Sequence, residues 1–310
     1  MTATADSGTG APSNGHGGTV LAFMNEVAGG RKLLEAVRER VAAGVNEVAV
    51  VAPQNLPVAG QIVDRDEVRE AALSRVEVTQ AVLHEFGIDS AGAIMDPDPA
   101  LALDDAIRAF TPREVLLSCL YGTRFGYTRK DLAEWAKQTF EVPITHIPVR
   151  IEDDAIRWDV THTLVVATRT VASSGLVARL KSRAADHPQR YTIVSPPSGG
   201  ITREEICDRL ARTLAEMYRA DIDATGQPMS PAPLGAINNA LEHYRIDEIL
   251  ISTLAGQQSK WLEEGLIDSV RSVTDKPVEH VEAGDDVVPP SSTQLPATEP
   301  VPVGAEEARA

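Results

Sequence analysis

The chain has 310 residues, and its 45 acidic and 29 basic side chains give it a formal charge of −16 at neutral pH. Apolar residues make up 43% of the sequence, enough to bury a core in each of two domains of ordinary size. Only 13 residues are aromatic, and an acidic surface with few rings repels phosphate groups, so we expect neither nucleic-acid binding nor attachment to an anionic membrane.

Both ends of the chain have the composition of unstructured tails. Residues 1–18 are rich in Gly, Ser, Thr and Ala, and residues 284–310 are rich in Pro, Val, Ala and Glu without a period. The start lacks the basic and apolar regions of a secretory signal, and no apolar run approaches the roughly 18 residues of a membrane span. We therefore expect a cytoplasmic protein with domains at 19–150 and 160–283 between two disordered tails.

Short β-branched runs alternate with amphipathic stretches through the first domain. The runs predict strands at 19–24, 47–52, 90–95, 114–119 and 143–149, and the amphipathic stretches predict helices near 30–43, 66–86, 99–109 and 128–139. Asp66 and Thr128 are expected as helix N-caps, and Gly87 as a helix stop. Such alternation is typical of a parallel sheet with crossover helices.

The second half of the chain repeats the first. Residues 96–147 align without a gap on residues 230–281, 134 positions later, with twelve identities in 52 positions. Earlier strands match less closely, 19–24 with 163–168 and 49–53 with 192–196. We infer a tandem duplication and an α/β fold of two domains, each with an open, mostly parallel sheet of five strands and helices on both faces. In a strand order of 3-2-1-4-5, ligands bind at the carboxyl ends of strands one and four.

The pattern resembles the universal stress protein family in a tandem two-domain form, over about residues 19–283. The features that carry the resemblance are the openings TVLAF and TLVVAT, the fourth strands EVLLSCLYG and DEILISTLAG, and the Pro-led fifth strands VPITHI and KPVEHV. It implies an adenine nucleotide alpha hydrolase-like fold, a stress-response role, and pairing of the domains, or of two chains in a homodimer, through the fifth strands.

Members of this family that bind ATP have an acidic residue after strand one and a glycine motif, G-x2-G-x9-G-[ST], after strand four. Here Asn25 follows strand one, and Gly122 and Gly126 have a G-x3-G spacing without a later Gly-Ser. Gly256 and Gly265 of the second copy also depart from the motif. ATP or AMP is the cofactor that the resemblance implies, and these departures indicate that the site is degraded.

The loop at 121–130 is the most unusual stretch, because it places glycines, cations, aromatic rings and hydroxyl groups after strand four. Backbone N–H groups and Arg124 would hold phosphate, while Tyr121 or Tyr127 would stack on a base. The alternative is an ordinary connection between a strand and a helix. The candidate cofactor-binding residues are Asn25, Tyr121, Gly122, Thr123, Arg124, Gly126, Tyr127 and Thr128.

Other motifs favour structural roles. His146 and His280 match across the repeat, but each is expected in a fifth strand among apolar neighbours. Cys119 and Cys207 lie in apolar segments without CxxC spacing, as buried small hydrophobes do. We therefore expect no catalytic residues and no metal site.

Together these features predict a universal stress-like regulatory protein, not an enzyme, that acts by binding a ligand or a partner. The alternative is an adenine-nucleotide-binding switch or weak ATPase that uses the 121–130 loop. A small-molecule nucleotide is the ligand to test in either case.

Overall fold

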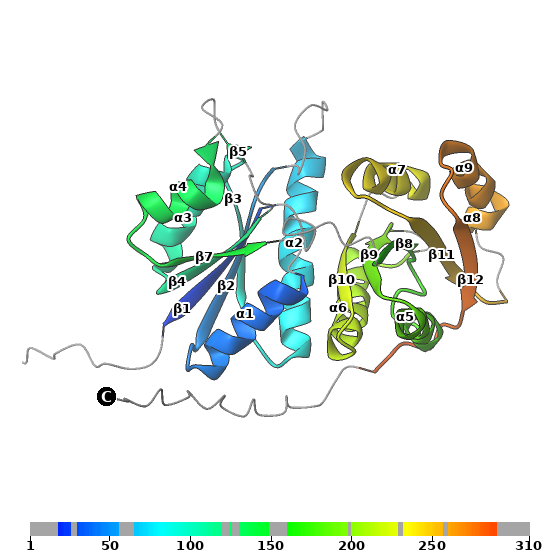
Figure 1. The fold of residues 1–310 in the computed structure, drawn as a ribbon, viewed down its shortest axis with the longest axis horizontal. Coiled ribbons are helices and arrows are strands. Elements are labelled where there is room, and N and C mark those ends of the chain that lie inside the picture. The colour runs from blue at the N-terminus through cyan, green and yellow to red at the C-terminus, as the bar shows by residue number, and fades with distance from the viewer. Residues whose placement is uncertain are drawn as a thin grey trace, which may run out of the picture.

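The computed structural model describes residues 18–25, 30–55, 65–119, 124–125, 130–148, 160–197, 200–228, 232–256 and 260–289 (Figure 1). Within these residues the chain forms two α/β domains, each built on a parallel sheet of five strands. No helix in these ranges is long and apolar enough to cross a membrane.

The first domain has the sheet order β3-β2-β1-β4-β7, which is the 3-2-1-4-5 order in which ligands bind at the carboxyl ends of strands one and four. Its strands are β1 (Thr19–Met24), β2 (Glu47–Pro53), β3 (Ala91–Met95), β4 (Glu114–Cys119) and β7 (Ile144–Pro148). Its helices are α1 (Arg31–Ala42), α2 (Arg65–Glu85), α3 (Pro99–Phe110) and α4 (Leu132–Thr139). A short antiparallel pair, β5 (Arg124–Phe125) and β6 (Lys130–Asp131), follows β4.

The second domain repeats this arrangement in the order β10-β9-β8-β11-β12. Its strands are β8 (Thr161–Val166), β9 (Gln189–Ser195), β10 (Asp223–Pro228), β11 (Glu248–Leu254) and β12 (Val278–Ala283). Its helices are α5 (Ser174–Asp186), α6 (Arg203–Arg219), α7 (Pro233–His243), α8 (Lys260–Glu263) and α9 (Leu266–Val273). Helix α9 begins and ends 134 residues after α4, so the predicted fold and the predicted repeat are both confirmed.

The strand registers correct one part of the predicted alignment. Val20 lies beside Glu114, and Thr163 lies beside Glu248, the residue that matches Glu114 in the repeat. Val20 and Thr163 are therefore equivalent, whereas the sequence alignment paired Thr163 with Thr19. The error is one residue, which in a strand exchanges the two faces. It arose because both strands are buried on both faces along almost their whole length and so give no period to align.

The repeat also extends upstream of the predicted block. Gly92 and Gly226 occupy the same place in β3 and β10, because their strands pair with β2 and β9 in the same register. A Cβ atom would lie 2.6 Å from Val76 Cγ1 at Gly92, and 2.8 Å from Leu210 Cδ1 at Gly226. Both glycines thus let a long helix, α2 or α6, approach its sheet closely.

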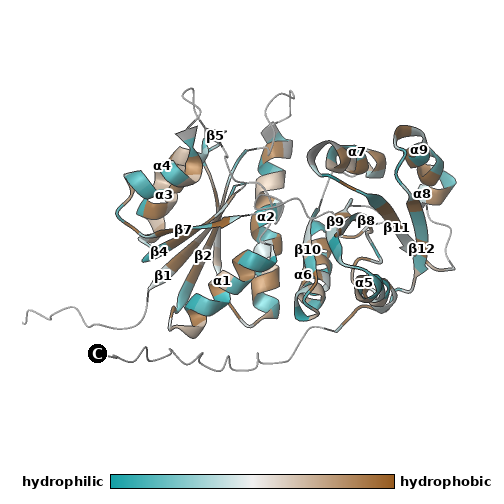
Figure 2. Ribbon diagram, in the orientation of Figure 1, coloured by the Kyte–Doolittle hydropathy of each residue, from teal (hydrophilic) through white to brown (hydrophobic). Residues whose placement is uncertain are grey.

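Helices cover both faces of each sheet, and the inner strands of the first sheet, β1, β2 and β4, are mainly apolar (Figure 2). One face of the first sheet packs on α3 and α4, and one face of the second packs on α7 to α9. The other two faces, covered by α1, α2, α5 and α6, belong to one continuous apolar cluster that runs through both domains. The domains therefore share part of their core.

Helices α2 and α6 form the main contact between the domains, side by side in the centre of Figure 1. The rings of Phe86 and Tyr218 meet edge to face with centroids 5.0 Å apart. Arg203 Nε donates to Glu77 Oε2 at 2.9 Å. Within the described residues, β7 pairs only with β4, and β12 only with β11, so the contact is not the expected pairing of fifth strands.

Helix boundaries follow local capping. Gly87 ends α2 in the left-handed region with φ 71°, as predicted, and its N–H donates to the His84 carbonyl oxygen. Asp66 lies inside α2, not at its N-cap, because the helix begins at Arg65. Asp131 caps α4 by accepting from the Glu134 N–H at 2.9 Å, whereas Thr128, the predicted cap, lies outside the described residues.

The first residues of the segment that was expected to be a disordered C-terminal tail form ordered structure instead. Residues 284–289, here called the C-terminal strap, run beside the loop between β8 and α5. Val288 N–H donates to the Ala172 carbonyl oxygen at 2.8 Å, and Ser174 N–H donates to the Asp286 carbonyl oxygen at 3.0 Å. Backbone pairing orders this segment, which composition alone could not reveal. Residues 290–310 and 1–17 lie outside the described residues.

Candidate functional site

The carboxyl ends of β1 and β4 meet at the switch point of the first sheet, where its sequence predicts a ligand site. Asn25, directly after β1, lies there and is 3% exposed. The backbone of Arg124 lies in β5, beyond the end of β4. The other six candidate residues, Tyr121, Gly122, Thr123, Gly126, Tyr127 and Thr128, lie outside the described residues.

A chain of polar side chains continues from Asn25 across this edge of the sheet. The Asn25 N–H donates to the Ser118 carbonyl oxygen at 2.9 Å, which ties the end of β1 to β4. Its Oδ1 accepts from Asn55 Nδ2 at 3.0 Å. Asn55 Oδ1 in turn accepts from Arg75 Nη2 at 3.2 Å. Asn25 is thus held in place by a network that reaches from β1 to α2.

Arg75, in helix α2, forms the other end of that network. It is the bulkiest of the side chains that the structure buries completely, with 1% of its surface exposed. Its Nη2 also donates to the Pro53 carbonyl oxygen at 2.6 Å and to the Asn55 carbonyl oxygen at 3.1 Å. A buried guanidinium is costly unless it is hydrogen bonded, and its charge acts strongly through the surrounding protein. Arg75 therefore places positive charge close beneath the switch point.

Arg75 and Asn55 are not among the site residues predicted from the sequence. A signal for Arg75 was present, since it falls on the apolar stripe of α2 at helical spacing. That stripe also contains Ala72, Thr79 and Val82, all of them buried. An arginine on such a stripe must be buried with polar partners. Asn55 gave no signal, because it lies in a connection without a period.

The second domain has different side chains at the equivalent edge. Thr168 takes the place of Asn25, and Pro196 the place of Pro53, as the strand registers show. Thr168 Oγ1 donates to the Pro196 carbonyl oxygen at 2.6 Å. In the first domain the carbonyl oxygen of Pro53 accepts from Arg75 instead. The Thr168 hydroxyl group thus links the end of β8 to the end of β9 without a positively charged side chain.

Arg209 of α6 takes the position of Arg75 but faces another set of partners. Its Nη1 donates to the Arg169 carbonyl oxygen at 2.6 Å, and its Nη2 lies 2.8 Å from Glu205 Oε1. Arg169 itself donates to Asp285 Oδ2 of the C-terminal strap at 2.9 Å. Hydrogen bonds therefore join Arg209 to the β8–α5 loop, and that loop to the C-terminal strap, at this edge.

The two matched histidines are edge-strand residues, as expected. His146 Nε2 lies 3.1 Å from the Cys119 carbonyl oxygen, and His280 Nε2 lies 2.7 Å from Thr253 Oγ1. Each ring therefore contacts the end of the neighbouring fourth strand. Within the described residues no group of three or more His, Cys, Asp and Glu side chains is arranged to hold a metal ion.

Both cysteines are buried and free, as predicted. Cys207 lies in the contact between α2 and α6, where its Sγ is 3.7 Å from Glu77 Oε2. Burial, with the nearby Glu77 carboxylate, raises the pKa of the Cys207 thiol to about 12. Burial also raises the pKa of Glu77 above its ordinary value. A thiol with so high a pKa is a poor nucleophile, so Cys207 is a packing residue.

No protein-family model matches this sequence, and neither does any curated protein. Among solved structures, the chain is similar to a universal stress protein from Archaeoglobus fulgidus DSM 4304, with 17% identity over 86% of this chain and 97% of that one, and a TM-score of 0.34. A universal stress protein in complex with cAMP is 17% identical over 40% of this chain and 98% of that one, with a TM-score of 0.31.

A histidinol dehydrogenase from Elizabethkingia anophelis is 12% identical over 86% of this chain and 53% of its own, with a TM-score of 0.23. Likenesses of this size indicate nothing about what the chain binds. The fold class is established by the chain's own two sheets and their strand orders.

Proposed function

We propose that the chain is a regulatory protein of universal-stress type that binds a small anionic ligand at the carboxyl edge of its first domain and does not turn it over. The observation that carries this proposal is the network of Asn25, Asn55 and Arg75 at the switch point of the first sheet. Open parallel sheets bind ligands at this place.

The charge at this edge favours an anion. The Arg75 guanidinium donates to carbonyl oxygens and to the Asn55 side chain, so its positive charge is held in a fixed position under the edge. An acidic residue after β1, typical of the ATP-binding relatives, is replaced by the neutral Asn25. A neutral amide over a buried cation attracts an anion more strongly than a carboxylate would in the same place.

In this proposal the second domain does not bind the ligand but packs against the domain that does. Its equivalent edge is occupied by its own side chains and by the C-terminal strap. Its β10 edge and helix α6 pack against the first domain. We infer that the ligand state of the first domain is transmitted to a partner through this shared core.

The second candidate function is an adenine-nucleotide switch or weak ATPase. It is favoured by the position of Arg124, whose backbone pairs with Asp131, the N-cap residue of α4. The backbone of this strand lies next to the start of a helix, and helix starts are places where phosphate groups bind.

One experiment separates the two functions. The purified full chain is denatured, the released small molecules are identified by mass spectrometry, and ATP hydrolysis is measured with the native protein. We expect no stoichiometric adenine nucleotide and no hydrolysis above that of heat-inactivated protein. Stoichiometric adenine nucleotide, or hydrolysis that Arg124→Ala abolishes, would overturn the proposal in favour of the switch. Absence of nucleotide, with no thermal shift on addition of ATP, would contradict the switch.

A further inference from the structure

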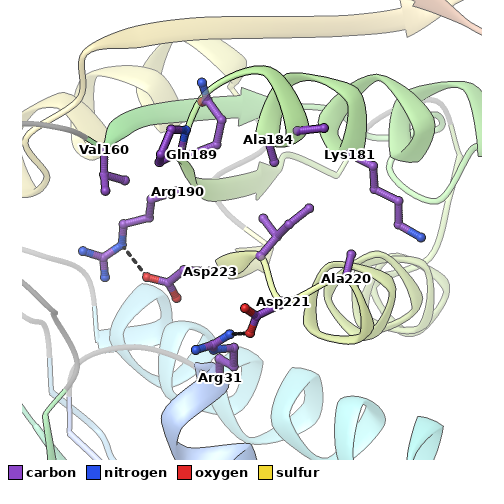
Figure 3. A pocket seen from close by; sticks show the side chains of 12 residues that line it. Arg31, Val160, Lys181, Ala184, Gln189, Arg190, Ala220, Asp221 and Asp223 are labelled. Atoms are coloured by element: carbon purple, nitrogen blue, oxygen red, sulfur yellow. Dashed lines mark hydrogen bonds and ion pairs between the residues drawn. The ribbon is translucent and has the colours of Figure 1, made fainter.

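A pocket of about 520 Å³ lies at the opposite end of the second sheet, between the two domains (Figure 3). It is formed by the starts of β9 and β10, the last turn of α5 and the residues between α6 and β10, and Arg31 at the start of α1 reaches it from the first domain. Ligand pockets commonly have volumes of about 300–1,000 Å³ and lie between domains. This pocket is separate from the switch point, which lies at the carboxyl ends of the strands.

The walls of the pocket are of two kinds. Val160, Ala184, Ala220 and Ile222 contribute apolar surface. Five charged side chains stand among them, and two ion pairs join four of these: Arg31 with Asp221 and Arg190 with Asp223 (Figure 3). Lys181, the fifth, lies 2.6 Å from Glu216 Oε2. A ligand for this pocket would thus have an apolar body and a charged group that replaces one partner of an ion pair.

The two ion pairs differ in how easily a ligand can replace one partner. Arg190 and Asp223 are 3.3 Å apart, with side chains only 10% and 22% exposed, so separating them would leave a charge poorly solvated. Asp221, in contrast, has 89% of its side chain exposed, whereas Arg31 has 29%. Asp221 can return to water at small cost, because exposed ion pairs contribute little. Arg31 Nη1 is then left in the pocket wall to bind an anion, while its Nε keeps the ion pair with Glu35 Oε1 at 3.5 Å.

The repeat explains why a carboxylate stands there. Asp221 has a left-handed backbone with φ 59°, and Gly87, 134 positions earlier, has φ 71° at the corresponding end of α2. Asp is one of the few residues with a side chain that accepts this conformation readily. The second copy thus carries, where the first has no side chain, a carboxylate that meets Arg31 across the domain boundary.

We propose that this pocket binds a small monocarboxylate with a compact apolar body, whose carboxylate takes the place of Asp221 on Arg31. The apolar body would pack against Ala184, Ala220 and Ile222. Because Arg31 belongs to the first domain and those three residues to the second, such a ligand joins the two domains.

The test uses three probes of equal length, hexanoate, hexylamine and 1-hexanol, titrated into the full chain and followed by ligand-observed NMR. Hexanoate should bind saturably, and the other two at least about tenfold more weakly, the size of a hydrogen bond to a charged group. Arg31→Gln should weaken hexanoate binding by about the same factor. Asp221→Asn should tighten it about two- to fivefold, because it removes the carboxylate that competes for Arg31 Nη1. Asn accepts a left-handed backbone too, so the wall keeps its shape.

Two variants serve as matched controls. Arg108→Gln and Asp268→Asn each remove a charge from an exposed helical ion pair away from the pocket, and hexanoate affinity should not change. Unchanged melting temperatures would confirm that all four variants fold. Failure of hexanoate to saturate, tighter binding of hexylamine, or weaker binding of hexanoate to Asp221→Asn would overturn the proposal. None of these results depends on Asn25, so the proposed function is tested separately.

Discussion

The carboxyl edges of the two sheets have equivalent backbones and different side chains. In the first domain Asn25 and the buried Arg75 belong to one network at the switch point. In the second, Thr168 binds the Pro196 carbonyl oxygen, and Arg209 turns to the β8–α5 loop beside the C-terminal strap. The two domains therefore differ in the side chains at the carboxyl edge of the sheet, although their strand orders are the same.

Away from these edges, an ion pair and a close helix–sheet contact are alike in the two domains. Arg40 Nη2 lies 2.8 Å from Glu114 Oε1 in the first domain, and Arg183 pairs with Glu248 at the same place in the second. Gly92 and Gly226 likewise leave room for α2 and α6. The comparison shows that the ion pair and the close helix packing serve the fold, whereas the edge residues are free to specialise.

The largest expected effect comes from removing the buried cation. Arg75→Met should lower the free energy of unfolding by about 3 kcal/mol, because the carbonyl oxygens of Pro53 and Asn55 lose a charged donor in a buried place. Arg209→Met should cost about 1 kcal/mol, since the Arg209 side chain is 15% exposed and water can replace part of its bonds. Urea unfolding of both variants measures the difference, and equal losses would show that the two edges are energetically alike.

Arg40→Gln removes the ion pair with Glu114, which has a counterpart in the second domain. It should lower the free energy of unfolding by about 1 kcal/mol at neutral pH. The hydrogen bond from Arg40 lowers the pKa of Glu114 below its ordinary value of 4.5, although burial acts in the opposite direction. A lowered carboxyl pKa stabilises the fold above the unfolded-state value, and this stabilisation is lost as the pH falls through the folded-state value. The difference between wild type and Arg40→Gln should therefore shrink as the pH drops below 4.5.

Two other variants complete that test. Arg183→Gln should cost somewhat more, because Arg183 contacts both Glu248 and Glu279. Arg271→Gln, whose partner Asp268 is 90% exposed, should cost less than about 0.5 kcal/mol. A pH-independent loss for Arg40→Gln would contradict the assigned role of the ion pair.

Most of the fold could be predicted from the sequence, since the strands, the crossover helices and the repeat all carry strong patterns. The start of the C-terminal strap could not, because it is ordered by backbone hydrogen bonds to residues 172–174, far away in sequence. The contact between α2 and α6 was missed for a related reason. Their apolar stripes look like ordinary core faces until both domains are placed together.

The position of the switch point could be predicted from the sequence, but most of the side chains that lie there could not. Strand order correctly located the switch point and Asn25, and the unusual composition of the 121–130 loop directed attention to Arg124 and its neighbours. Arg75 and Asn55 come from other segments, and only the packing of α2 on the sheet brings them to Asn25. The side chains of 121–130 lie outside the described part of the structure, so their role stays a prediction.

The central claim is that the first domain, and not the second, binds an anion at its carboxyl edge. It is tested most directly by thermal unfolding of wild type, Asn25→Leu and Thr168→Val with inorganic phosphate or pyrophosphate. Asn25 and Thr168 occupy equivalent positions, so each variant is the control of the other. We predict that at least one anion raises the melting temperature of wild type and of Thr168→Val but not of Asn25→Leu. A response retained by Asn25→Leu and lost in Thr168→Val, or no response in wild type, would contradict the account.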